Sequence, residues 1–247
     1  MTNNIVITMA GRGSRFIEAG YKQPKYEIQA KGRSLFEWSM LSLTNFISEN
    51  SRVIFVCLRE NASEEFIMQR CEHLGIKNVH ILLIDNVTDG QATTAYLSKH
   101  LWSMEDPLLI YNIDTYVNQC ALTPDMIHPD SEGWVPCFKA AGEHWSFVQL
   151  AKDGWAVDIA EKRRISDNAT IGLYWFKQAK KYVEAYDRYF SCPENLVNGE
   201  RYVAPLYRDL IHSGNRISIS DIKFDHVHVL GTPAELQEFM STPIDID

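Results

Sequence analysis

The sequence lacks several features that would assign a protein to a common class. Its 247 residues contain no run that approaches the ~20 apolar residues needed for a membrane-spanning helix. No basic segment followed by a long apolar stretch opens the chain, so we expect no signal peptide. A net charge of −8 argues against a nucleic-acid-binding surface. We therefore expect a soluble, cytoplasmic protein that binds neither membranes nor nucleic acids.

Cysteine is scarce and irregularly spaced. The chain has five cysteines, an odd number, and no two of them have Cys-x-x-Cys spacing. This pattern predicts neither a disulfide framework nor a zinc ribbon. We expect most of the cysteines to be small core residues in a reducing compartment. A chain of this length buries roughly 70–75% of the surface that it exposes when unfolded, so its core needs no cross-link.

Strand-like and helix-like segments alternate through the first half of the chain, which predicts a mostly parallel sheet with helices on both faces. The expected strands there are 5–9, 52–58, 79–84 and 107–111, and the expected helices are 34–49, 62–74 and 90–102. Later strands are short and separated by turns, which is typical of antiparallel pairing. These are 133–138, 146–150, 156–159, 170–176 and 224–229, with helices at 178–190, 204–212 and 233–240. We expect one Rossmann-like α/β domain with a small antiparallel region.

The loop after the first expected strand holds two glycines, a serine and two arginines within residues 11–15, and Pro24-Lys25 follows. Backbone amides in such a turn can point at an anion, and glycine allows a phosphate to approach closely. The dinucleotide-binding fingerprint does not fit, because its third glycine would fall on Phe16, and no P-loop Gly-Lys-Ser/Thr is present. The loop predicts a polyphosphate site; a turn that merely needs glycine is the alternative.

Three motifs carry a family resemblance: Gly-x-Gly-Ser-Arg-Phe at 11–16, Gln-Pro-Lys at 23–25 and Gly-Arg-Ser-Leu-Phe-Glu-Trp at 32–38. Together they resemble the opening of the sugar-phosphate nucleotidylyltransferases, the nucleoside-diphosphate-sugar pyrophosphorylases. The resemblance implies their nucleotide-diphospho-sugar transferase fold, which is GT-A-like. It divides the single domain into a nucleotide-binding half, 1–130, and an acceptor-binding half, 131–247.

The resemblance also assigns roles to the residues of the loop and its surroundings. It implies that Arg15 and Lys25 are catalytic, with the lysine neutralising the reacting phosphates. The residues implied to bind the nucleotide are Ala10, Gly11, Gly13, Ser14 and Gln91. A side-chain amide offers both a donor and an acceptor to a base edge, which suits Gln91 to that role. The alternative for residues 89–95 is an ordinary helix start.

Asp114 follows an apolar strand, where an unpaired carboxylate is costly unless a cation meets it. Mg²⁺ prefers a few carboxylates together with phosphate oxygens, so Asp114 is a candidate metal ligand; a helix-cap or turn aspartate is the alternative. The resemblance agrees, since the family carries a metal aspartate after this strand. Residue 116 is tyrosine, so the Asp-x-Asp pattern of many glycosyltransferases is absent.

The second metal position departs from the family pattern. The family's second aspartate sits two residues before the Gly-Thr-Pro at 231–233, and here that position is Val229. Three alternatives stay open. Asp225 is displaced into the role, His226 or His228 replaces it, or the metal relies on Asp114 and phosphates.

The acceptor side of the resemblance lies in the second half. Glu161-Lys162, followed by Ala-x-x-Gly-x-Tyr-x-Phe around Gly172, is similar to the acceptor-binding strand pair of the family. There the glutamate contacts sugar hydroxyls, the lysine contacts the phosphate of the sugar phosphate, and the glycine lies beside the acceptor. Adjacent exposed charges of little energetic value are the alternative reading of the Glu-Lys pair.

The resemblance implies an enzyme that joins a nucleoside triphosphate to a sugar 1-phosphate or similar phosphorylated metabolite, releases pyrophosphate and uses Mg²⁺. A chain with no C-terminal β-helix domain looks like the smaller family members, which favours CTP or UTP. Supply of nucleotide sugars for polysaccharide biosynthesis is the implied role, and a homo-oligomer stays open. A glycosyltransferase of similar architecture and a non-catalytic nucleotide-binding relative are the alternatives.

Overall fold

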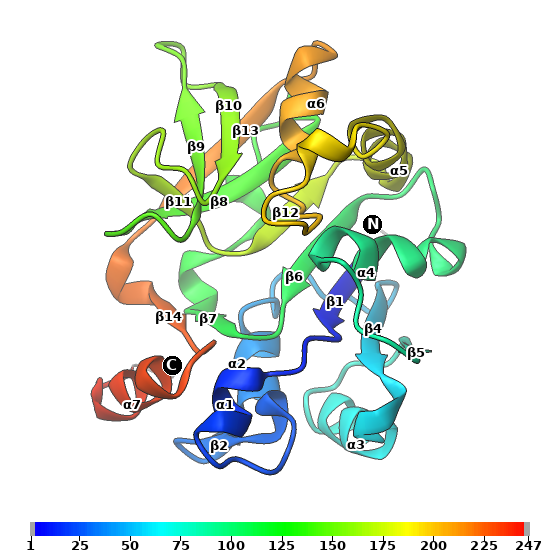
Figure 1. The fold of residues 1–247 in the computed structure, drawn as a ribbon, viewed down its shortest axis with the longest axis vertical. Coiled ribbons are helices and arrows are strands. Elements are labelled where there is room, and N and C mark those ends of the chain that lie inside the picture. Colours follow the sequence, from blue (N-terminus) through cyan, green and yellow to red (C-terminus); the bar gives the residue numbers. More distant parts are fainter. Residues whose placement is uncertain (1–2, 245–247) are drawn as a thin grey trace.

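The computed structural model describes residues 3–244, and one long mixed sheet runs through them (Figure 1). Its strands are β1 (Asn4–Met9), β4 (Arg52–Leu58), β5 (Val79–Ile84), β6 (Leu108–Asn112), β8 (Gly133–Lys139), β9 (Ser146–Leu150), β10 (Ala156–Glu161), β11 (Asn168–Thr170), β12 (Leu173–Phe176) and β13 (Ile217–Ile222). They are ordered β10-β9-β11-β8-β12-β6-β1-β4-β5, and β13 also pairs with β8.

One end of the sheet is parallel, as the sequence predicts. Strand β1 lies between β6 and β4, and β5 pairs with the far side of β4, all in parallel. Ile5, Val6 and Ile7 are fully buried because helices cover both faces of the strand. The carboxyl ends of these strands therefore meet at one edge, where parallel sheets place their ligand sites.

The other end of the sheet is an antiparallel wing. β12 pairs antiparallel with both β6 and β8, and so joins the wing to the parallel end. The expected strand 170–176 is wrong as a single strand, because Gly172 adopts a φ of +81° and separates β11 from β12. Strand β13, which runs parallel beside β8, is not predicted from the sequence.

Helices cover both faces, which confirms the predicted α/β architecture. On one face lie α2 (Leu35–Leu41) and α3 (Glu64–His73), and on the other α4 (Gln91–Leu97), α5 (Ala179–Tyr189) and α6 (Leu206–His212). The shorter elements are α1 (Ser14–Glu18), β2 (Gln29–Ala30), β3 (Arg33–Ser34), β7 (Thr115–Val117), β14 (Val227–Val229) and α7 (Pro233–Ser241). None of the described helices has the length and apolarity that crossing a membrane requires.

Two expected helices are shorter than predicted. The helix expected at 34–49 ends at Leu41, because the residues that follow dock on other elements. The Ser42 hydroxyl accepts a hydrogen bond from the Val117 amide (2.8 Å), and Asn45 donates to the Gln119 carbonyl (2.7 Å). The helix expected at 90–102 likewise ends at Leu97. Tertiary hydrogen bonds of this kind override an apolar period of 3.6 residues.

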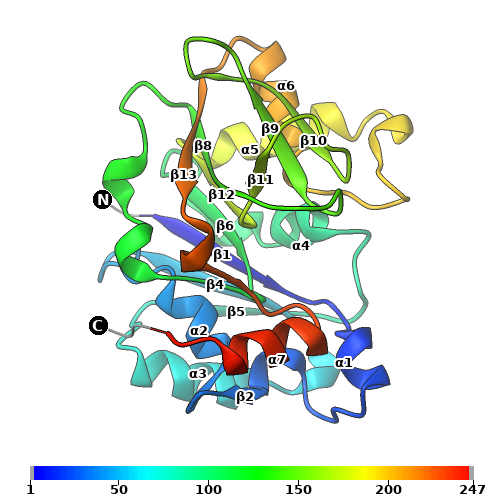
Figure 2. The same cartoon turned by 90° about the vertical axis from the view of Figure 1, so that its left-hand side faces the viewer.

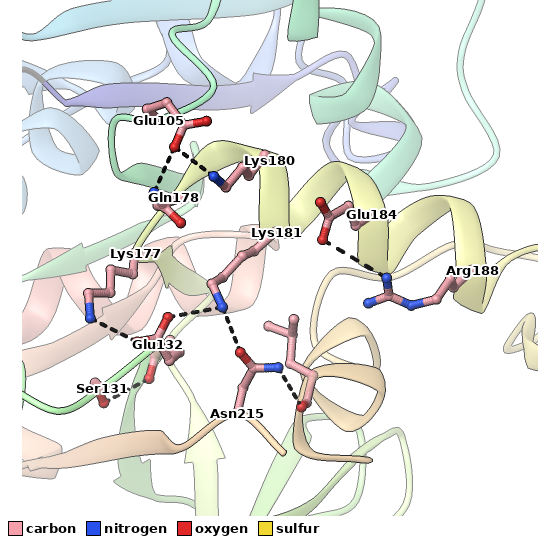
Figure 3. Close-up of polar contacts among 12 residues, drawn as sticks. Glu105, Ser131, Glu132, Lys177, Gln178, Lys180, Lys181, Glu184, Arg188 and Asn215 are labelled. Carbon is pink, nitrogen blue, oxygen red and sulfur yellow. Dashed lines mark hydrogen bonds and ion pairs between the residues drawn. The ribbon is translucent and has the colours of Figure 1, made fainter. Parts of the chain in front are cut away.

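Charged contacts orient α5 against the sheet (Figure 3). Glu132 accepts hydrogen bonds from Lys177 (2.8 Å) and Lys181 (3.0 Å). Burial raises the pKa of Glu132, but the hydrogen bonds and charges of the two lysines outweigh it and lower the pKa overall. Lys180 pairs in the same way with Glu105 at 2.7 Å. Such partly exposed pairs contribute little stability, so their main effect is to select one orientation of the helix.

A third hydrophobic cluster holds α7 against α1 and α2 (Figure 2). Trp38 of α2 meets Phe239 of α7 edge-on with 5.3 Å between ring centroids, and Phe16 of α1 is buried in the same cluster. The C-terminal helix is thereby held beside the loop that follows β1. This packing brings residues from both ends of the chain to the carboxyl edge of the sheet.

Helix α2 begins with a complete capping box, which provides a test of the fold. The Ser34 hydroxyl accepts from the Glu37 amide (3.2 Å), and the Glu37 carboxylate accepts from the Ser34 amide (2.8 Å). Ser34→Ala should lower the free energy of unfolding, measured with urea, by about 1 kcal/mol. Ser241→Ala, at an exposed hydroxyl of α7, should change it by less than about 0.5 kcal/mol. Equal losses would contradict the capping role.

Candidate active site

A cavity of about 360 Å³ opens at the carboxyl edge of the parallel strands. Its lining includes Arg15 from the first turn of α1, Gln91 from the start of α4 and Asp114 from the segment after β6. Residues of the antiparallel wing and of α7 complete its walls. Segments that follow β1, β5 and β6 thus meet at one cavity.

The glycine loop turns from β1 into α1. Gly13 precedes the helix with a φ of +63°, a left-handed conformation that favours glycine. Gly13, Ser14 and Arg15 line the cavity. Ala10 is buried at the end of the strand and Gly11 is exposed, and neither is among the lining residues.

An ion pair joins this loop region to the end of β6. Lys25 Nζ lies 2.6 Å from Asp114 Oδ2, with side chains that are 17% and 24% exposed. Asn112 donates a hydrogen bond to the other carboxylate oxygen at 2.7 Å. Burial raises the pKa of Asp114, but the charge and hydrogen bond of Lys25 outweigh it, and the pKa lies below its usual value. Asp114 is thus held as a carboxylate that faces cations.

The position of Lys25 is set by its neighbour in the chain. Tyr26 is 1% exposed, and its hydroxyl hydrogen-bonds with the Ser63 hydroxyl at 2.7 Å. Burial raises the pKa of Tyr26 to about 12, so this anchor stays neutral. The short helix Lys25–Glu27 therefore fixes the lysine with its side chain toward Asp114.

Gly172 lines the cavity and also makes room for the residue that holds Asp114. A Cβ at Gly172 would lie 2.2 Å from Asn112 Oδ1, a distance that no real side chain tolerates. Its φ of +81° is likewise suited to glycine. The Gly172 backbone thus packs directly on Asn112, which in turn orients the Asp114 carboxylate.

The loop before α4 is packed against the segment at 198–207. A Cβ at Gly90 would lie 2.3 Å from the Arg201 carbonyl oxygen, which instead accepts a hydrogen bond from the Ala92 amide at 3.0 Å. Gln91 points into the cavity, and its Nε2 donates to the Thr8 hydroxyl at 3.2 Å. The close approach at Gly90 carries the residue after Arg201 into the cavity wall.

The acceptor-side candidates lie on the opposite wall. Glu161 lines the cavity and accepts a short hydrogen bond from Ser146. Burial raises its pKa above the usual value, and the Ser146 hydroxyl and Lys162 only partly compensate. Lys162 is exposed; its Nζ lies 4.6 Å from the ring centroid of Tyr202 and hydrogen-bonds to the Tyr202 hydroxyl. Tyr202, and not Lys162, is among the lining residues.

Comparison with solved structures shows the family. The crystal structure of a nucleoside-diphosphate-sugar pyrophosphorylase from Vibrio cholerae RC9 is 33% identical to this chain, with a TM-score of 0.88 over 96% of this chain and 100% of that one. The chain belongs to this family of sugar-phosphate nucleotidylyltransferases. An inositol-1-phosphate CTP transferase from T. maritima matches over 96% of this chain and 94% of its own, at 17% identity and a TM-score of 0.74. That likeness shows the fold alone.

The other comparisons find no relative: no protein-family model and no curated protein matches the chain. The assignment of this pyrophosphorylase-family chain therefore relies on the structural match and on the motifs. These motifs converge in space, since the glycine loop, Lys25, Gln91 and Asp114 surround one cavity.

Asp225 does not lie with Asp114 in this family member. It belongs to a short 3-10 helix, Phe224–His226, and not to the expected strand 224–229. It lines a neighbouring cavity of about 530 Å³, and His228 stacks on Tyr116 with 5.6 Å between ring centroids. Within residues 3–244, no group of three or more His, Cys, Asp or Glu side chains could hold a metal ion. Asp225 and His228 therefore lie outside the cavity that Asp114 lines.

Several lining residues were missed by the sequence analysis. Asn112 lies two positions before Asp114, and its spacing along the strand end is a signal that could have found it. Tyr202 belongs to the segment before α6, whose sequence singles out no residue as part of a site. The remaining missed residues include His144, Trp145, Ser146, Tyr174 and Glu235. They come from the wing and from α7, whose approach no local pattern shows.

The close contact at Gly172 predicts a specific loss of stability. Gly172→Ala should cost about 1–2 kcal/mol for its left-handed backbone, plus about 1 kcal/mol for the displaced Asn112 hydrogen bond. Gly154→Ala is the matched control, since Gly154 has a φ of +87° with nothing within 4 Å. Urea unfolding measures both variants. If the two lose equal free energy, Asn112 is not supported by Gly172.

Proposed function

We propose that this family member transfers the nucleotidyl group of CTP or UTP to a sugar 1-phosphate or a similar phosphorylated metabolite, with release of pyrophosphate. The observation that carries the proposal is the Lys25–Asp114 pair, at 2.6 Å, beside the loop formed by Gly13, Ser14 and Arg15. A cation-lined loop and a carboxylate at one cavity suit a triphosphate. We place the reaction in the cytoplasm, where nucleoside triphosphates are available.

In this proposal the reaction is an in-line displacement. An oxygen of the acceptor phosphate attacks the α-phosphorus, and the bond from the α-phosphorus to the bridging oxygen breaks, so that the electron pair leaves with pyrophosphate. No covalent enzyme intermediate forms, and the protein acts by positioning and by neutralising charge. Arg15 steadies the departing pyrophosphate, and Lys25 meets the charge at the α-phosphate. The amides of residues 11–14 hold the outer phosphates.

The acceptor binds on the wall formed by the antiparallel wing. Lys162 supplies a positive charge for the acceptor phosphate, and its contact with Tyr202 limits the positions that its side chain adopts. Glu161 accepts from Ser146 and faces the cavity, where it is placed to hydrogen-bond with hydroxyl groups. Ring atoms of Trp145 and His144 line the same wall, with centroids 4.3 Å apart. These groups together suit a polyhydroxylated phosphate ester.

Mg²⁺ is part of the proposal, because the donor atoms present fit it. Oxygen ligands suit this ion, and Asp114 presents a carboxylate to the cavity. The Oε2 atom of Glu235, which lines the same cavity, is buried and has no hydrogen-bond partner among the described residues. Asp114 would hold the ion, which when bound neutralises phosphate charge and orients the triphosphate.

A pyrophosphate-release assay tests the function. The four nucleoside triphosphates are screened, with Mg²⁺, against a panel of sugar 1-phosphates and other phosphorylated metabolites. We expect release that requires both a triphosphate and an acceptor, with CTP or UTP as the donor. Nucleoside diphosphate released from a nucleotide sugar would instead indicate a glycosyltransferase. Tight nucleotide binding without turnover would indicate a non-catalytic relative.

Removal of the lysine charge should strongly reduce turnover. Lys25→Ala should lower kcat by about 10²–10³-fold, as expected for loss of one preorganised group at a charged transition state. Lys22→Ala, at an exposed lysine of the same loop, is the control and should keep wild-type activity. Circular dichroism checks that both variants are folded. A folded Lys25→Ala variant with nearly unchanged kcat would exclude Lys25 from the site.

A further inference from the structure

The position that should carry the second metal aspartate of the family is apolar in this chain. Val229 lines the cavity, but its side chain has no donor atom. Asp225 lies in the neighbouring cavity. A metal site at Asp114 therefore needs a second carboxylate from another element, or none.

Helix α7 brings a carboxylate to the cavity in an unusual state. Thr232 caps this helix, and its hydroxyl accepts from the Glu235 amide at 3.2 Å. In a complete capping box, such as Ser34 and Glu37 form at α2, the glutamate carboxylate returns to the capping residue's own amide. At α7 that reciprocal hydrogen bond is not made among residues 3–244, and Glu235 Oε2 is buried without a partner. Its side chain is therefore not explained by capping.

Gly231 shows where this carboxylate points. A Cβ placed at Gly231 would lie 3.4 Å from Asp114 Oδ2 and 3.5 Å from Glu235 Oε2. The carboxylate of Asp114, which follows β6, and the carboxylate of Glu235 on α7 thus flank one small space. Gly231, Asp114 and Glu235 all line the cavity. Two carboxylates that face the same point repel each other unless a cation lies between them.

Lys25 accounts for only one of the two charges. Its Nζ pairs with Asp114 Oδ2, while Glu235 Oε2 keeps no hydrogen-bond partner among residues 3–244. A carboxylate oxygen that is buried without a partner is costly, and such groups pair with a cation or coordinate a metal. Mg²⁺ sites in enzymes that act on phosphates use one or two carboxylates together with substrate oxygens, which matches this pair.

We propose that Glu235, reaching across Gly231, is the second carboxylate ligand of the divalent cation at Asp114. It takes the role of the family's second metal aspartate, whose position is occupied here by Val229. This inference rests on the proposed nucleotidyl transfer, which supplies the reason for a divalent cation. It assigns the first turn of α7 to the active site. The cluster of Phe239, Trp38 and Phe16 holds α7 against α1 and α2, and so keeps Glu235 beside Asp114.

Mn²⁺ binding tests the proposal without measuring activity. Electron paramagnetic resonance follows free Mn²⁺ titrated into the protein, alone and with inorganic tripolyphosphate. Glu235→Gln should weaken Mn²⁺ binding by about tenfold or more. Glu238→Gln, at an exposed glutamate of the same helix, and Asp225→Asn should bind like the wild type. Wild-type-like binding by Glu235→Gln, loss in Asp225→Asn, or no Mn²⁺ binding by the wild type in either condition would overturn the proposal.

Thermal unfolding without metal separates a ligand role from a structural one. Glu235→Gln removes the charge of a partly buried carboxylate whose Oε2 atom has no partner among residues 3–244, so its melting temperature should equal or exceed that of the wild type. A lower melting temperature together with unchanged Mn²⁺ binding would mean that Glu235 supports the fold instead. Failure of the pyrophosphate assay with Glu235-dependent Mn²⁺ binding would refute the nucleotidyl transfer alone. Pyrophosphate release with Mn²⁺ binding that is independent of Glu235 would refute only this inference.

Discussion

The ion pair between Lys25 and Asp114 is the interaction on which the candidate site depends. It joins two segments separated by 89 positions in the chain, across the carboxyl edge of the parallel sheet. Both side chains are largely buried, so each charge needs the other, and removal of either partner leaves an uncompensated charge in the cavity. The rest of the arrangement supports this pair. Tyr26 anchors the lysine, and Asn112, held close to Gly172, orients the carboxylate.

The cavity exists because two kinds of sheet meet beside that pair. Strand β12 pairs antiparallel with β6 and so places the wing next to the parallel end of the sheet. The turn at Gly172, between β11 and β12, carries the wing's residues to the cavity wall. A second close approach, at Gly90, binds the loop before α4 to the backbone of Arg201. Both glycines are required by backbone conformation and by space, and together they join the opposite walls of the cavity.

Two carboxyl groups of the same cavity have pKa values shifted in opposite directions. Burial disfavours the charged form of both, but Asp114 has an ammonium group at 2.6 Å and an amide donor, which lower its pKa overall. Glu161 has the Ser146 hydroxyl as a donor and the charge of Lys162 nearby, but burial outweighs both, and the pKa of Glu161 is raised. Groups separated in this way suit different tasks: a fixed anion for cations on one wall, and a hydrogen-bonding group for a polar acceptor on the other.

Much of this protein could be read from its sequence. Alternating strands and helices predicted the parallel end of the sheet, and strand 52–58 and strand 79–84 match the structure residue for residue, because each is a run of mainly apolar residues. The glycine loop and Asp114 could be predicted because each follows a strand, and parallel strands end at one edge. Lys25 could be predicted because the Gln-Pro-Lys motif resembles the family. Packing decided the rest. The early end of helix 34–49, the parallel return of β13 and the split at Gly172 depend on contacts between distant segments.

The orientation of the Glu235 side chain also depends on such a contact. Its sequence pattern predicts a capping residue, and only the approach of α7 to Asp114 turns the side chain toward the cavity. Local patterns set which residues each strand end or helix start offers, whereas the partner that each one meets is determined by the tertiary fold.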